Sequence, residues 1–211
     1  MEIIIWIVAF AISITIHEAS HAWTSDRLGD PTARLMGRLS LNPIKHYDPV
    51  GTTLLLVLVI MRSIGIPVIP FGWAKPVPID PYNLENPKKD AALISLAGPL
   101  SNMILATILA IILRIFPTEI VFTITYPVIM LNVVLAIFNL IPVHPLDGGK
   151  ILVGILPKKE AHELDIVLTR YGTFILLVLI FPFAGSSIIS SVFNPIVGFI
   201  LNLLIPGSGT V

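Results

Sequence analysis

The chain has 211 residues, of which 55% are hydrophobic and only 12% are charged. An ordinary soluble domain carries about 25% charged residues, so this chain has too little polar material to cover a water-facing surface. Its formal net charge of +0, with 13 basic and 13 acidic residues, excludes charge-driven disorder and offers no basic face for nucleic acid. The absence of cysteine excludes a disulfide scaffold, a thiolate metal site and a cysteine nucleophile. Any metal ion must be held by histidine or carboxylate side chains.

Five apolar stretches are predicted to cross a bilayer, a distance that takes about 20 apolar residues in a helix. The last two are short, and we expect them to be antiparallel because Pro182 and Gly185 break the uncharged run that contains them. The predicted crossings are residues 2–23, 91–113, 120–146, 168–184 and 188–206.

Residues 49–61 form a shorter apolar run, whose length is more typical of a re-entrant segment than of a crossing. With this segment re-entrant and the N-terminus outside, every one of the 13 basic residues except Arg114 lies on one side. A crossing at 49–61 would distribute them far more evenly, so the positive-inside rule favours re-entry. We therefore predict three loops on the cytoplasmic side, at 26–48, 62–89 and 147–170.

Residues 66–80 combine β-branched residues with prolines, which predicts an extended edge strand, because proline cannot donate to a ladder on both sides. The predicted fold class is a mainly α membrane protein: a polytopic helical bundle of 5 to 6 membrane segments with a small membrane-associated β element. No linker or internal repeat is evident. We therefore expect one domain over residues 1–211, with a catalytic core at about 1–156 and a C-terminal helical pair at about 168–206.

Three ionisable residues, His17, Glu18 and His21, stand inside the first apolar helix, where each costs about 2.5–3.5 kcal/mol on insertion scales. They form an HExxH pattern, whose i, i+4 spacing places both imidazoles on one helix face, able to hold one metal ion. Glu18 is displaced around the helix and can act as a general base on a water molecule at the ion. The alternative is that the histidines are hydrated near Asp26 and Arg27 at the membrane surface, and the long apolar run before them argues against it.

A catalytic zinc site normally takes three protein ligands and one water molecule, so a third ligand is needed. Asp147 is the candidate, because it ends the uncharged run at 120–146. The prolines and glycines of residues 142–149 predict unwound chain at membrane depth, which is tolerated where it lines a cavity or is buried in protein. A turn at the membrane surface is the alternative for this segment.

Three stretches, in this order along the chain, resemble the signature motifs of the site-2 protease family of intramembrane zinc metalloproteases. The resemblance is to a minimal form without a PDZ or CBS domain. It implies one Zn²⁺ per chain, with His17, His21 and Asp147 as metal ligands and Glu18 as the catalytic base. It also implies that Asn139 is catalytic, with its amide hydrogen-bonded to the scissile carbonyl or the oxyanion. The stretches are residues 17–21, 97–102 and 139–148.

The resemblance further implies the partners of the chain. The substrate is expected to be a transmembrane protein that binds as an extended strand against residues 68–80. The other expected partner is the lipid bilayer of the cell membrane, with the active site toward the cytoplasm. Nucleic acid is not an expected partner, and the sequence leaves a homo-oligomer open.

Five further residues have interpretations that depend on their surroundings. We expect His144 to lie near the metal without being a ligand, because the family pattern does not require histidine there; the alternative is that it competes as the third ligand or shuttles protons. His46 and His162 stand among charged loop residues and are interpreted as solvated. Gly98 is expected to allow close helix packing, with Asn102 forming a hydrogen bond across the helix interface and not acting directly in catalysis.

Two other functions are compatible with parts of this pattern. One is an intramembrane zinc hydrolase acting on a lipid amide or ester, although a lipid has no need of an edge strand. The other is a metal or proton transporter, but such transporters tend to have a second, symmetry-related interrupted helix, and the sequence shows no counterpart to residues 139–149.

Overall fold

The computed structural model describes residues 2–66, 72–180 and 188–205, which form a mainly helical structure as predicted. Two short 3-10 helices, η1 (Pro43–His46) and η2 (Pro81–Asn83), lie in the loops. The α-helices are α1 (Glu2–Arg27), α2 (Thr32–Leu35), α3 (Gly51–Ser63), α4 (Pro87–Ile115), α5 (Glu119–Asn139), α6 (Asp147–Ile155), α7 (Lys158–Ile180) and α8 (Ile188–Leu204).

Three of the described helices, α1, α4 and α5, are long and apolar enough to cross a membrane. Helices α3 and α8 contain shorter apolar stretches, and the first half of α7 carries several charges. The chain is therefore a membrane protein by these three helices, and the full number of 5 to 6 membrane segments stays a prediction.

The β element predicted for residues 68–80 is not supported by the described part of the chain. Residues 67–71 lie outside it, and residues 72–80 are extended without forming a ladder. The Lys75 backbone N–H donates to the His46 carbonyl at 3.0 Å, an isolated bond to a 3-10 helix. The physical reason is that this extended segment has no neighbouring strand among the described residues with which to form a ladder.

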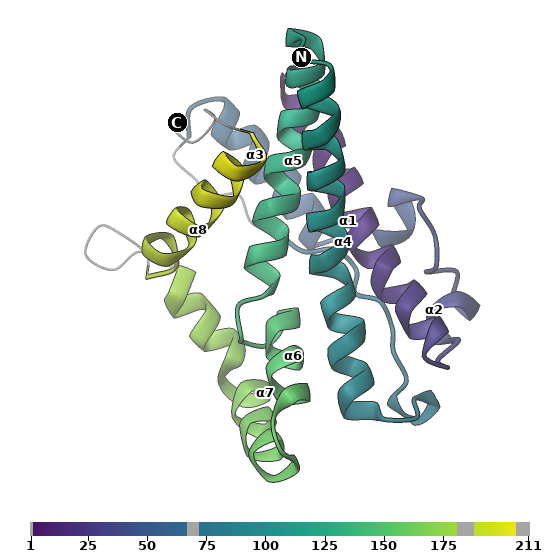
Figure 1. Cartoon of the computed structure of the whole chain (residues 1–211). Helices are drawn as coiled ribbons and strands as arrows, with labels where there is room; N and C mark the ends of the chain where they lie inside the picture. Colours follow the sequence, from purple (N-terminus) through teal and green to yellow (C-terminus); the bar gives the residue numbers. More distant parts are fainter. Residues whose placement is uncertain (1, 67–71, 181–187, 206–211) are drawn as a thin grey trace.

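Helix α4 is the central element, and it packs against α1, α5 and α6 (Figure 1). A buried apolar cluster joins α4, α5 and α8, and small side chains such as Ala106 and Ala110 let these helices approach closely. The outer helix faces keep large apolar side chains exposed, including Ile108 and Ile124, as expected for surfaces that contact lipid.

The ends of the long helices define two opposite sides of the bundle (Figure 1). The N-terminus of α1 and the α4–α5 turn lie on one side, while α2 and the α6–α7 pair lie on the other. Aspartate side chains accept backbone N–H groups at two helix starts: Asp48 Oδ1 accepts the Gly51 N–H at 2.7 Å at α3, and Asp90 Oδ2 accepts the Asn86 N–H at 2.7 Å at α4. These bonds stabilise the passage from loop to helix at both places.

Candidate metal centre

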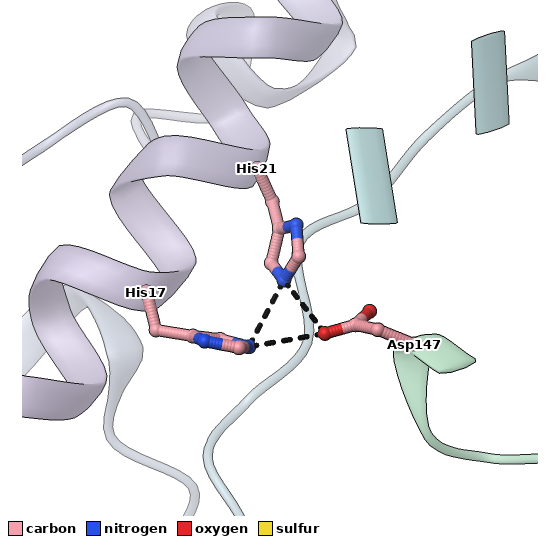
Figure 2. Close-up of side chains that lie close together, drawn as sticks. All are labelled: His17, His21 and Asp147. Atoms are coloured by element: carbon pink, nitrogen blue, oxygen red, sulfur yellow. Dashed lines mark hydrogen bonds and ion pairs between the residues drawn. The ribbon is translucent and has the colours of Figure 1, made fainter. Parts of the chain in front are cut away.

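Helices α1 and α6 bring His17, His21 and Asp147 together, as Figure 2 shows. The two Nε2 atoms of the histidines are 3.0 Å apart. Asp147 Oδ2 lies 3.2 Å from Nε2 of His17 and 3.3 Å from Nε2 of His21. All three residues are buried. The convergence that the sequence predicted between two distant stretches is present in the structure.

The donor set fits a zinc ion. Tetrahedral zinc with bonds of about 2.0–2.1 Å places its ligand atoms about 3.3 Å apart, close to the three separations measured here. Asp147 Oδ2 is buried and has no hydrogen-bond partner among the described residues, although it is within ion-pair distance of both imidazoles. A buried carboxylate oxygen in this condition needs a cation.

Helix α4 orients both imidazole rings. Nδ1 of His21 is 2.7 Å from the Ile94 carbonyl oxygen, which can only accept, so this nitrogen carries the proton. Nδ1 of His17 is 2.6 Å from Asn102 Oδ1. Such bonds on the outer ring nitrogen are typical of histidines that bind metals, because they leave Nε2 free as the ligand atom. Asn102 therefore does more than join two helices.

Gly98 provides the space in which the rings lie. A Cβ atom at this position would be 2.5 Å from Nε2 of His21 and 2.6 Å from Cε1 of His17. We predicted that Gly98 allows close helix packing, and the groups that pack closely against it are the two imidazole rings of α1.

The backbone between α5 and α6 places Asp147 at the centre. Helix α5 ends at Asn139, and irregular chain follows until Asp147 begins α6. Gly148 packs so tightly against the carbonyl groups of Leu140 and Ile141 that a Cβ atom would clash with both. The unwound segment predicted from its prolines and glycines is therefore present, and Asp147 is buried beside α1 instead of lying in a surface turn.

Glu18 is buried next to the two histidines and forms no hydrogen bond with any described residue. Arg38, whose side chain is also buried, lies near enough for its charge to interact with that of Glu18. Burial lowers the pKa of the Arg38 guanidinium, and the Glu18 carboxylate partly offsets this effect. A buried cation therefore lies within electrostatic range of the predicted base, a feature that the sequence reasoning missed.

The remaining predicted residues have mixed outcomes. His144 is outside the three-residue cluster, and its Nε2 pairs with Asp165 Oδ1 at 3.1 Å. His162 is exposed, as predicted. The solvated interpretation of His46 is wrong: this residue is 1% exposed, because its ring packs inside the loop and Nε2 donates to the Ser40 carbonyl at 2.8 Å.

Asn139 occupies the last position of α5, where its amide Nδ2 donates to the Leu135 carbonyl at 3.0 Å. This bond stays within its own helix. The amide oxygen has no hydrogen-bond partner among the described residues. A catalytic role for Asn139 stays a prediction.

Comparison with known proteins decides the family. YwhC of Bacillus subtilis is 35% identical to the chain over 198 residues, which cover 89% of this chain and 85% of YwhC. The chain belongs to peptidase family M50, the site-2 protease family. The sequence profile of Peptidase family M50 matches residues 115–180, which include α5, α6 and Asp147.

Other relatives of this M50 peptidase match over shorter lengths. Rip2 of Mycolicibacterium smegmatis is 34% identical over 149 residues, 69% of this chain and 54% of Rip2. MJ0392 of Methanocaldococcus jannaschii is 40% identical over 77 residues, 36% of this chain and 23% of MJ0392. The names of all three relatives assign them to the zinc metalloproteases. No solved structure matches the chain. The M50 peptidase is thus a zinc metalloprotease, with a protein substrate and a membrane environment.

Proposed function

We propose that this M50 peptidase is an intramembrane endopeptidase, which cleaves a peptide bond within or near a transmembrane segment of a membrane protein. The observation that carries the proposal is the buried cluster of His17, His21 and Asp147 on helices of the membrane bundle. Two of these residues lie in α1, a helix long enough to cross a bilayer. Ionisable groups are rare at such depth and usually mark a functional site.

The proposed roles follow from the positions of the side chains. His17, His21 and Asp147 would hold the zinc ion, which when bound supplies Lewis-acid chemistry by polarising a carbonyl and acidifying water. Glu18 takes a proton from the attacking water and later donates it to the leaving amine, so it returns to its starting state. Its lack of a hydrogen-bond partner among the described residues supports this role, because the carboxylate is available to accept. The Asn139 amide is proposed to bind the scissile carbonyl or the oxyanion.

The extended segment 72–80 supports binding of the substrate as a strand. Backbone groups of alternate residues in an extended chain point to opposite edges. On one edge Pro76 and Pro78 have no N–H group to donate. On the other edge, Val77 and Ile79 have both an N–H and a C=O group without a partner in the described part of the chain. We propose that an unwound substrate pairs with this second edge.

We further propose that residues 1–211 act as a single domain, with 5 to 6 membrane segments and the metal centre facing the cytoplasmic side of the cell membrane. The distribution of basic residues supports this orientation, since Arg114 is in the last turn of α4, and the α4–α5 turn lies on the side opposite to α2 and the α6–α7 pair (Figure 1). A homo-oligomer is compatible with this arrangement.

The experiment compares purified wild-type protein with the Glu18→Gln variant. Each is assayed for zinc content and for cleavage of a transmembrane peptide, with total lipid extract as a second substrate and ion flux in liposomes as a third assay. We expect both proteins to hold one zinc and only the wild type to cleave the peptide. Cleavage by Glu18→Gln would remove the mechanism. Hydrolysis of lipid alone, or ion flux without proteolysis, would replace the proposed function with one of its alternatives.

A further inference from the structure

A chain of buried polar side chains extends from His17 through three helices. Asn102 on α4, Asn132 on α5 and Ser13 on α1 are all 0% exposed. Asn102 Nδ2 lies 2.6 Å from Asn132 Oδ1 and 3.0 Å from the Ser13 carbonyl oxygen. Asn132 Nδ2 lies 2.7 Å from the Ser13 hydroxyl and 2.7 Å from the Val128 carbonyl oxygen. The network thus joins α5 to the metal centre, although α5 supplies none of the clustered ligands.

The direction of each hydrogen bond follows from groups that can only accept. The Val128 carbonyl needs a donor, so the NH₂ group of Asn132 faces it and Asn132 Oδ1 faces Asn102. Asn102 must therefore present its own NH₂ group to Asn132, and the Ser13 carbonyl requires the same orientation. The Ser13 hydroxyl donates to the Ala9 carbonyl at 2.7 Å and so accepts from Asn132. No amide in this network can flip without placing two oxygen atoms in contact.

The amide orientation leaves one oxygen for His17. Since both N–H groups of Asn102 are used elsewhere, Asn102 Oδ1 faces Nδ1 of His17 and only a protonated Nδ1 can satisfy it. The proton on Nδ1 leaves the Nε2 lone pair directed at His21 and Asp147. A flipped amide or the other His17 tautomer would leave a buried polar group without a hydrogen-bond partner, which costs much free energy inside the bundle. The amide orientations and the His17 tautomer are therefore fixed.

We propose that Asn132 is a positioning residue that acts through Asn102 to hold His17 in the tautomer whose Nε2 can bind the metal. The inference rests on the proposed metal role of His17, and it is independent of the substrate. Partners of this kind behind a metal ligand typically change metal affinity by about 10–100-fold when they are removed.

The first test uses the zinc-loaded wild-type protein with ¹⁵N-labelled histidine in detergent micelles. The His17 signals are assigned by their loss in the His17→Gln variant. We expect Nδ1 of His17 to carry a slowly exchanging proton and Nε2 to carry none. A proton on Nε2 would overturn the inference. Because this test uses the wild-type network, it does not require any variant of Asn102 or Asn132 to fold.

The second test measures zinc affinity by competition with a chelator for Asn132→Leu, Asn102→Leu and the double variant. We expect about tenfold weaker zinc binding or more for each single variant. The double variant should be no weaker than Asn102→Leu alone, because Asn132 acts only through Asn102. Thr125→Val is the matched control on α5, since Thr125 Oγ1 bonds only to the Val121 carbonyl of its own helix, and its zinc affinity should match the wild type.

Three outcomes of the zinc-affinity test would also overturn the inference. They are unchanged zinc affinity in Asn132→Leu, full additivity in the double variant, and equal losses in Asn132→Leu and Thr125→Val. A wild-type protein that binds no zinc would also remove it, together with the proposed function. Zinc binding without proteolysis would contradict the proposed function, but the proposed role of Asn132 in positioning His17 through Asn102 would stand.

Discussion

Gly98 is the residue at which a single added methyl group would meet both imidazole rings. A Cβ atom 2.5 Å from Nε2 of His21 forces a shift of the rings or of α4. We expect Gly98→Ala to lower the unfolding free energy by about 1–3 kcal/mol through overpacking. Cleavage should fall about 100-fold, because a displacement of the catalytic groups by about 1 Å has that effect. Thermal unfolding and peptide cleavage in detergent measure the two quantities.

Gly198 on α8 provides the matched control. No atom lies within 4 Å of a Cβ atom built at this position, so Gly198→Ala should keep full activity and gain slightly in stability. If Gly98→Ala and Gly198→Ala behave alike, the space at Gly98 has no part in the centre.

Polar and ionisable residues that cost free energy to bury in an apolar helix could be predicted from the sequence alone. His17, Glu18 and His21 stand out because an apolar helix does not normally contain them. Asn132 carries the same signal, as a polar amide within the uncharged run at 120–146, and this rule could have found it. Arg38 carries no such signal, because basic residues are ordinary in a loop and only its packing against residues 72–80 reveals its burial.

Among the connecting elements, the loop after α1 is organised by Asp30, which is 0% exposed. Its carboxylate accepts hydrogen bonds from the Ser25 hydroxyl, from Thr32, from the Asn83 side chain at 3.0 Å and from the Asp80 N–H at 2.8 Å. Burial opposes ionisation of Asp30, but the hydrogen bonds from Thr32, Asn83 and Asp80 prevail and lower its pKa to about 2. Asp30 thereby ties the end of α1 to the end of the extended segment 72–80.

The stability that Asp30 provides depends on pH in a defined direction. Because the folded-state pKa of about 2 is below the ordinary value of 3.8, the contribution is fully present above about pH 4 and is lost as pH falls through 2. We expect Asp30→Asn to reduce the unfolding free energy by about 2 kcal/mol at neutral pH, since it removes hydrogen bonds to a charged group. Unfolding curves between pH 2 and 7 should show the gap from wild type narrowing toward low pH.

Asp26→Asn tests whether this effect belongs to the buried network. Asp26 forms an exposed ion pair with Arg34 at 2.8 Å, and such pairs contribute about 0–1 kcal/mol. An equal loss in both variants, or a gap for Asp30→Asn that widens at low pH, would contradict the assignment.

Arg38 links two elements, because its guanidinium donates to the carbonyl groups of Lys75 and Pro76. We expect Arg38→Met to raise the KM for a transmembrane peptide about tenfold while zinc content stays at one per chain, since the extended segment loses its support. Arg34→Met, which removes only an exposed ion pair, is the control and should leave KM unchanged. An unchanged KM in Arg38→Met would show that segment 72–80 does not depend on this contact.

Elements defined by long apolar runs were predictable. The runs at 91–113 and 120–146 correspond to α4 and α5, and the prolines after Asn139 correctly indicated the break before α6. The β element at 68–80 was not supported, because β-branched residues and prolines specify extended chain but cannot supply a neighbouring strand. Pairing between strands is a tertiary property that local sequence does not encode.

For the whole molecule, the length of α3 predicts how the bundle lies in the bilayer. Helix α3 has 13 residues and so is about 20 Å long, shorter than the roughly 30 Å hydrocarbon layer. Since the chain has no cysteine, single cysteines report topology directly. We expect Val50→Cys and Ile64→Cys, at exposed positions flanking α3, to react with an impermeant maleimide from the same side as Leu35→Cys.

Phe116→Cys, in the exposed turn between α4 and α5, provides the opposite reference and should react only from the other side. Labelling of right-side-out and inverted vesicles separates the two sides. If Val50→Cys and Ile64→Cys react from opposite sides, α3 crosses the bilayer and the predicted orientation of every later loop is reversed.

The fold brings α1 and α6 together so that His21 Nε2 and Asp147 Oδ2, on residues 126 positions apart along the chain, lie 3.3 Å apart, where we propose that they share one ion. The most direct measurement is zinc content and X-ray absorption of the detergent-purified wild type and the Asp147→Ala variant. One zinc per wild-type chain, bound by two imidazoles and oxygen ligands, with loss of tight zinc binding in Asp147→Ala, is the result predicted here. Asp147→Ala that keeps one zinc with an unchanged absorption spectrum would contradict it.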